Sequence, residues 1–191
     1  MPACVKSSEV ILAIFLLCLC AISGCARDAA GNRFELQQVN ANWSNGQLKA
    51  TLRQNLTLSA EARDALVHGV PLTIQMELII RNTGDQTRVD NSLERYEIRY
   101  LPLSDHYQLS LPDGTEVRTF PRLRHLLSEL STVSLFIKTG ALPAGEYELL
   151  ARTSLDKQKM PPPMRLPVLF SSAWEHDSDW SSWPLDIQPQ A

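Results

Sequence analysis

Cysteine and histidine are the side chains of this chain that could carry chemistry, and their positions limit what that chemistry could be. The cysteines all lie within the first 25 residues, at Cys4, Cys18, Cys20 and Cys25. An ionised thiol is a strong nucleophile and can be alkylated or oxidised. No cysteine follows Cys25, so the rest of the chain offers it no disulfide partner. The pattern therefore favours modification of one thiol over a disulfide framework.

The segment before Cys25 is typical of an export signal. Val10 to Ala21 form an unbroken apolar run of twelve residues behind Lys6 and Glu9. This length suits a signal peptide, whose core has roughly 7–15 residues, and is short for a membrane span of about 20. Ile22-Ser23-Gly24-Cys25 follows and resembles the lipobox of bacterial lipoproteins. The resemblance implies that diacylglycerol is attached to the Cys25 thiol and that the chain is cut just before it. Ordinary secretion and an uncleaved anchor are the alternatives, with Cys25 then incidental.

The residues after Cys25 bear on the destination of a lipoprotein. Ala26 and Arg27 follow the cysteine, whereas an aspartate there commonly retains lipoproteins in the inner membrane. We therefore expect the periplasmic face of the outer membrane, with an inner-membrane anchor facing the periplasm as the alternative. The expected partners are the membrane, bound through the Cys25 lipid, and an envelope protein.

No histidine suggests a catalytic or metal site. No two of the four lie at metal-ligand spacing, and neither a GxSxG turn nor a glycine-rich phosphate loop is present. The four histidines are His68, His106, His125 and His176. Asp177 and Asp179 fall short of the roughly six to eight oxygens that calcium takes. We therefore expect no metal, no cofactor and no enzymatic activity. A hydrolase or polymer-modifying enzyme with an unrecognised site, and a carrier of lipid or another hydrophobic ligand, are the alternatives.

Tryptophans are concentrated near the end of the chain. Three of the four lie within ten residues, at Trp174, Trp180 and Trp183. One interpretation is that Trp174 and Trp180 fold over an open end of the domain, each covering a large apolar area. The other is a partner-binding patch, because tryptophan concentrates binding energy at interfaces. Arg165 is a further candidate contact residue, or a structural clamp.

The distribution of charge along the chain bears on whether nucleic acid could be a partner. The chain has 191 residues and a net charge of −3, with acidic and basic residues interspersed. No block of like charges marks a nucleic-acid arm. We therefore expect one domain and no nucleic-acid partner.

Most of the chain after the leader alternates between apolar and polar residues, which is typical of half-buried strands. The clearest example is Leu72 to Arg81, and a slip of phase before Val39 predicts a β-bulge. Asn45-Gly46 predicts a tight hairpin. The strands expected are 34–43, 48–52, 72–81, 96–100, 107–111, 133–137, 147–151 and 164–170.

Two segments have the pattern of short helices. One is capped by Ser59 and ends before Gly69, and the other spans 121–130 with leucines on one face. The fold class expected is all-β: an antiparallel β-sandwich, immunoglobulin-like in architecture, with about seven to nine strands and one or two inserted helices. The expected divisions are a signal peptide over 1–24, a lipidated cysteine and tether over 25–33, the sandwich over 34–185 and a tail over 186–191.

The order of several landmarks resembles an uncharacterised proteobacterial envelope family, domain-of-unknown-function 4390. The resemblance covers about Phe34 to Trp183 and rests on five pieces of sequence together. They are Ala65 to Leu72, Tyr96 to Tyr100 with Tyr107, Tyr147 to Asp156, Pro161 to Leu166, and the closing tryptophans. The resemblance implies an exported domain of no assigned activity, and so it supplies no catalytic positions.

Overall fold

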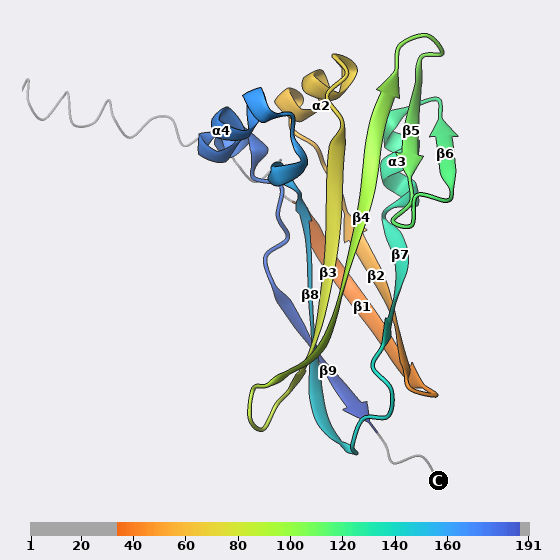
Figure 1. The fold of residues 1–191 in the computed structure, drawn as a ribbon, viewed down its shortest axis with the longest axis vertical. Coiled ribbons are helices and arrows are strands. Elements are labelled where there is room, and N and C mark those ends of the chain that lie inside the picture. The colour runs from red at the N-terminus through yellow and green to blue at the C-terminus, as the bar shows by residue number, and fades with distance from the viewer. Residues whose placement is uncertain (1–33, 188–191) are drawn as a thin grey trace, which may run out of the picture. The chain divides into compact units, whose positions relative to one another are not determined.

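The computed structural model describes residues 34–187, which form two antiparallel β-sheets with short helices in the connections (Figure 1). The elements follow the order β1 (Glu35–Ser44), β2 (Gln47–Asn55), α2 (Ala60–Val67), β3 (Leu72–Asn82), β4 (Arg88–Leu101), β5 (His106–Ser110), β6 (Val117–Phe120), α3 (Leu123–Glu129), β7 (Thr132–Lys138), β8 (Gly145–Leu155), the 3₁₀ turn η2 (Lys157–Lys159), α4 (Pro162–Phe170), the 3₁₀ turn η3 (Ser172–Trp174) and β9 (Ser181–Ile187). None of the helices in this part of the chain is long and apolar enough to span a bilayer.

The two sheets confirm the expected β-sandwich. The smaller sheet has the strand order β1-β2-β7, and the larger has the order β6-β5-β4-β3-β8-β9. Every strand pair is antiparallel. β3 lies inside the larger sheet, with β4 and β8 as its neighbours.

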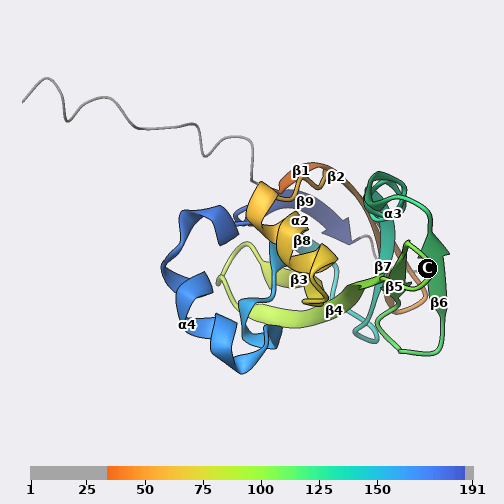
Figure 2. The ribbon, with the colours of Figure 1, turned by 90° about the horizontal axis from the view of Figure 1, so that it is seen from above.

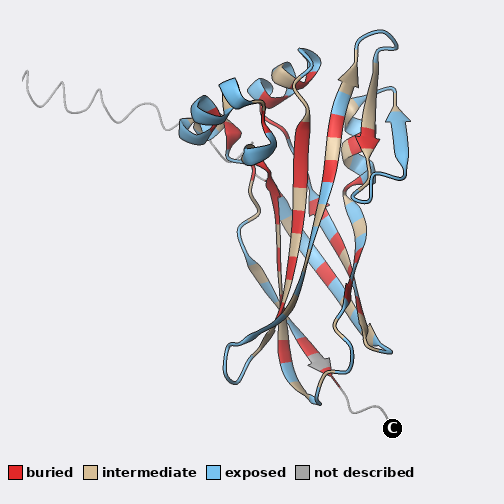
Figure 3. Cartoon of the chain, in the orientation of Figure 1, coloured by how far each residue is buried: buried red, intermediate tan, exposed pale blue. Residues whose placement is uncertain are grey.

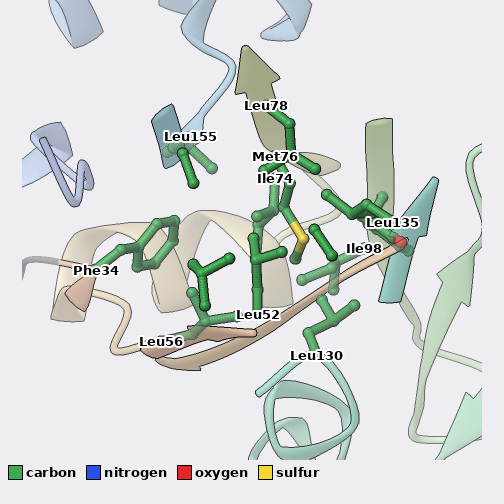
Figure 4. Packing of buried hydrophobic residues seen from close by; sticks show 14 of the residues in the cluster. Phe34, Leu52, Leu56, Ile74, Met76, Leu78, Ile98, Leu130, Leu135 and Leu155 are labelled. Carbon is green, nitrogen blue, oxygen red and sulfur yellow. The ribbon is translucent and has the colours of Figure 1, made fainter. Parts of the chain in front are cut away.

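The sequence pattern of β3 explains its central place. Leu72, Ile74, Met76, Leu78 and Ile80 are completely buried, and the alternate residues face away from the smaller sheet. Figure 3 shows the resulting alternation of burial along the strands. Burying one such side chain contributes about 1.5–3 kcal/mol relative to leaving it in water. Figure 4 shows Ile74, Met76 and Leu78 in one buried cluster with Leu52 and Leu135 of the smaller sheet.

The register separates the connections into two ends. At the helical end β1 begins, β2 leads through α2 into β3, β4 turns into β5, and β8 leads into η2, α4 and η3. At the hairpin end lie the β1–β2 turn, the β3–β4 turn and the β7–β8 loop. Figures 1 and 2 show α2 and α4 together at the helical end.

Local signals in the sequence account for several elements. The β1–β2 turn forms at Asn45 and Gly46, which both have positive φ (51° and 75°). The predicted bulge lies between Leu36 and Gln38. In α2 the Ser59 hydroxyl accepts the Ala62 N–H at 3.0 Å, as expected of the predicted cap. These elements and α3 were predicted from the sequence and are confirmed.

The prediction of a final strand over 164–170 is wrong. These residues form α4, so the described part of the chain has three α-helices instead of one or two. Two prolines occupy the first helical positions, where their missing N–H groups cost nothing, and only Val168 is buried. The last strand is β9, which pairs along β8 and extends to Ile187.

One polar side chain joins the two sheets inside the core. Gln54 of β2 is 2% exposed and occupies a position of the inward-facing, otherwise apolar, row. Its amide donates to the Leu130 carbonyl at 2.8 Å, and its carbonyl accepts the Thr153 hydroxyl of β8 at 2.6 Å. A buried amide is tolerated only when it is hydrogen-bonded in this way. Gln54 therefore links β2, β8 and the end of α3.

Replacing Gln54 by leucine is expected to lower the free energy of unfolding by about 1–3 kcal/mol, because the buried Thr153 hydroxyl loses its acceptor. Urea denaturation measures the change. The matched double variant Gln54→Leu/Thr153→Val removes both partners and should lose less than the sum of the two single variants. Strict additivity of the two losses would show that the hydrogen bond between these side chains does not contribute.

Candidate functional site

The residues predicted to attach lipid or to contact a partner do not form one cluster among the described residues. Cys25 is outside the described residues, so its lipidation stays a prediction. Trp174 is 7% exposed and belongs to the core. Trp183 of β9 lies opposite Leu149 of β8 and packs against the core. Trp180 is 40% exposed, and Arg165 is exposed while its Nε donates to the Met160 carbonyl at 2.9 Å.

Trp180 lies over an ion pair that fastens the C-terminal segment to the sheet. The Arg152 Nε of β8 donates to both Asp177 carboxylate oxygens at 2.9 and 3.0 Å, and a second guanidinium nitrogen also contacts Asp177. The guanidinium carbon is 5.8 Å from the centroid of the Trp180 ring. The hydrogen bonding to Asp177 raises the pKa of the Arg152 guanidinium. The Asp177 carboxylate is thus committed to Arg152, and Trp180 covers the pair.

Other charges on the same outer face of the larger sheet are also paired across strands. The Arg81 Nε of β3 donates to the Glu148 carboxylate of β8 at 2.7 Å, and Ser182 of β9 donates to it at 2.6 Å. These hydrogen bonds, the one from Arg81 foremost, lower the pKa of Glu148. Arg95 of β4 pairs with Asp156 at 3.1 Å. This face therefore uses its charges to hold neighbouring strands together.

A groove of about 730 Å³ opens at the hairpin end, between the β1–β2 turn and the β7–β8 loop. We call it the hairpin groove. Its lining residues are Trp43, Asn45, Gly46, Gln47, Lys138, Gly140, Ala141 and Leu142. The volume falls within the range of about 300–1,000 Å³ that is usual for ligand sites.

Two glycines hold the two sides of the hairpin groove together. The Gly140 N–H donates to the Gly46 carbonyl at 3.1 Å, and both residues have positive φ. A Cβ atom on Gly46 would lie 3.2 Å from the Gly140 backbone, which is too close for an ordinary contact. The approach of the two loops therefore depends on glycine at position 46.

The described lining of the hairpin groove combines one aromatic ring, two amides and one amine. Trp43 supplies an aromatic surface at the end of β1, and Asn45 and Gln47 supply amide donors and acceptors. Among the described residues that line the groove, Lys138 is the one with an ionisable side chain. The aromatic ring can supply apolar contact area, and the amides can donate and accept hydrogen bonds. In the part of the chain that the structure describes, no three histidine, cysteine or acidic residues are grouped as metal ligands would be.

A smaller hollow of about 460 Å³ lies at the same end, along β8 and β9. Tyr147, Glu148 and Ser182 contribute to its lining. The Tyr147 hydroxyl donates to the Pro143 carbonyl at 3.0 Å, so the ring also fixes the β7–β8 loop that borders the hairpin groove. The two hollows thus share a supporting residue.

At the other end of the sandwich a buried histidine joins segments that are distant in the sequence. The His176 Nε2 accepts the Ser59 N–H at 2.9 Å, and its ring centroid is 5.4 Å from that of Phe34. Its backbone carbonyl accepts the Leu155 N–H at 2.9 Å. His176 therefore connects the start of β1, the cap of α2 and the end of β8. No sequence motif marks this role, because the partners lie far away along the chain.

The family resemblance found in the sequence is confirmed by comparison with a family model. The model of the family described as "Domain of unknown function (DUF4390)" matches residues 31–184. No curated protein matches the chain. The match covers the sandwich from before β1 into β9, and the family description names no activity.

Burial lowers the pKa of His176 below its ordinary value of 6.5. The unfolded chain therefore takes up a proton at higher pH than the folded chain, and stability should fall as the pH drops below about 6.5. The variant His176→Gln keeps a hydrogen-bond acceptor for the Ser59 N–H but cannot titrate. The unfolding free energy of this variant should therefore change less than that of the wild type between pH 7.5 and 5.5, an interval that includes the ordinary histidine pKa of about 6.5.

Urea denaturation across this pH range measures the difference. His125→Gln, which replaces an exposed histidine, is the matched control and should keep the wild-type dependence on pH. If His176→Gln also kept that dependence, the buried ring would not be the source of the acid sensitivity.

Proposed function

We propose that this chain, which belongs to the DUF4390 family of domains of unknown function, is a lipid-anchored, non-catalytic binding module of the bacterial envelope. The observation that carries the proposal is the sequence Ile22-Ser23-Gly24-Cys25 behind an apolar run. A thiol at this position is the acceptor of diacylglycerol in bacterial lipoproteins. Export to the periplasm, with the outer membrane favoured, is part of the same proposal.

The separation of the two ends of the sandwich supports this function. Residues 26–33 would form a tether of eight residues, which spans at most about 30 Å at roughly 3.5 Å each. β1 then begins at the helical end, and its 10 residues extend about 33 Å at roughly 3.3 Å each. An anchor on Cys25 would thus act at the helical end, while the hairpin groove opens at the end farther along β1.

The lining of the hairpin groove supports binding as the activity of the anchored domain. Trp43 offers apolar area at low entropic cost, and the amides of Asn45 and Gln47 can fix the orientation of a ligand. The groove is formed by two loops that glycine holds together, so it is prepared before a ligand arrives. Pre-organisation of this kind reduces the entropy lost on binding. An envelope protein is the partner we favour.

Labelling with a palmitate analogue in living cells tests the anchor. Wild-type protein should carry the label, and Cys25→Ser should lose it because the serine hydroxyl is a much weaker nucleophile. Cys20→Ser is the matched control: this residue would leave with the signal peptide, so the label should remain. Equal labelling of wild type and Cys25→Ser would overturn the lipid anchor.

Photo-crosslinking in intact cells tests the hairpin groove. A benzophenone side chain at Gln47 should give discrete adducts, and the same side chain at Phe136, an exposed position on the outer face of β7, should not. Trp43→Ala should reduce the Gln47 adducts about thirtyfold, the effect of losing a central tryptophan contact of ~2 kcal/mol. Phe136→Ala is the matched control and should leave them unchanged.

Two outcomes would contradict the binding function of this groove. One is the same set of adducts from both crosslinker positions, which would show no preference for the groove. The other is turnover in a broad hydrolase panel that is lost in Trp43→Ala or Lys138→Ala, which would favour the alternative of an enzyme.

A further inference from the structure

Helix α4 presents its apolar residues to solvent. Leu166, Leu169 and Phe170 are 68%, 56% and 88% exposed, and their spacing places them on one face of the helix. Val168 is the buried residue of α4. A helix on the surface of a soluble domain ordinarily turns its apolar stripe inward. We call Leu166, Leu169 and Phe170 the α4 face.

The segment that carries the α4 face is basic, although Asp156, which is paired with Arg95, and Glu175 flank it. Between Lys157 and Trp174 the sequence contains Lys157, Lys159 and Arg165 and no acidic residue. Lys159 and Arg165 are exposed, and Lys157 is partly exposed. Apolar residues flanked by lysine and arginine are the pattern of a helix that lies at the surface of an anionic membrane.

The α4 face lies at the end of the sandwich where the described chain begins. The Phe34 ring packs on His176, which follows Phe170 by six residues. Figures 1 and 2 show α4 at the same end as α2 and the start of β1. A lipid on Cys25, nine residues before Phe34, would therefore hold a bilayer within about 30 Å of this end.

We propose that the α4 face, with Lys157 and Lys159 beside it, docks onto the anionic surface of the bilayer that holds the Cys25 lipid. The inference rests on the proposed function, because the tether supplies the bilayer at high local concentration. The apolar side chains enter the boundary between headgroups and acyl chains, and the lysines pair with phosphate groups. Docking holds the helical end against the membrane and directs the hairpin groove into the periplasm.

The single cysteine of the mature chain makes a direct test available. The full-length gene is expressed, and the lipidated product is reconstituted into vesicles of phosphatidylethanolamine with a minority of phosphatidylglycerol. Because the Cys25 thiol is blocked by lipid, a cysteine introduced by Ser172→Cys is the only thiol that takes up an environment-sensitive dye. Ser172 is exposed and lies two residues after Phe170. Ser44→Cys, an exposed position at the hairpin end, is the matched control.

Nitroxide-labelled acyl chains should quench the dye at position 172 and leave the dye at position 44 unquenched. Leu166→Gln/Phe170→Gln should abolish this difference, and both replaced side chains are exposed, so the fold should survive, as circular dichroism can verify. Lys157→Gln/Lys159→Gln should lower the equilibrium constant of docking by about fivefold for each lysine, with a loss that shrinks at high salt.

The outcomes separate the docking from the anchor. Vesicles that carry the protein without quenching at position 172 would overturn the docking and leave the anchor intact. Protein without an introduced cysteine that takes up dye at Cys25 and fails to float with vesicles would overturn the anchor itself. A dye at position 172 that is shielded only at high protein density, without quenching by lipid, would overturn the docking in favour of a contact between two copies of this chain.

Discussion

The inward face of β3 is the constraint on which the rest of the structure depends. Its five buried side chains alternate strictly with outward ones, so a shift of one residue would expose all of them to water. The register of β3 fixes β4 and β8 on its two sides, and these strands carry the connections that form the two ends of the sandwich. The position of the hairpin groove and that of α4 therefore both follow from the burial of one strand.

Different interactions stabilise the two ends of the sandwich. At the helical end, Gln54 and His176 make buried hydrogen bonds between segments that are far apart in the sequence. Such bonds are costly to leave unmade, so they specify one arrangement of the chain. At the hairpin end, Gly46 and Gly140 allow two loops to approach through their backbones. Trp43 and Gln47 line the groove beside this approach.

The sequence was sufficient where a structure depends on neighbouring residues. The turn at Asn45-Gly46, the cap at Ser59 and the alternation of β3 are all determined by residues close together in the sequence. It failed for Met164 to Phe170, where a helix with most of its apolar residues exposed has the same alternation as a strand. It also missed β9, because Pro184 resembles a strand breaker; an edge strand tolerates proline, since one side of it needs no ladder hydrogen bonds. Gln54 and His176 could not be predicted, because their partners meet only in the folded chain.

The outer face of the larger sheet and helix α4 use their side chains in different ways. On the outer face of the larger sheet, Arg81, Arg95 and Arg152 each pair with a carboxylate, and Trp180 covers one of these pairs. The two ends of the sandwich differ from this face. The α4 face exposes apolar side chains at one end, and the hairpin groove, lined by Trp43, is open at the other. Local departures from consistent folding tend to mark functional surfaces. Since β1 runs from the first end to the second, a membrane contact at α4 would set the direction in which the groove faces. Attachment and recognition would then be coupled through one rigid strand, with no moving part between them.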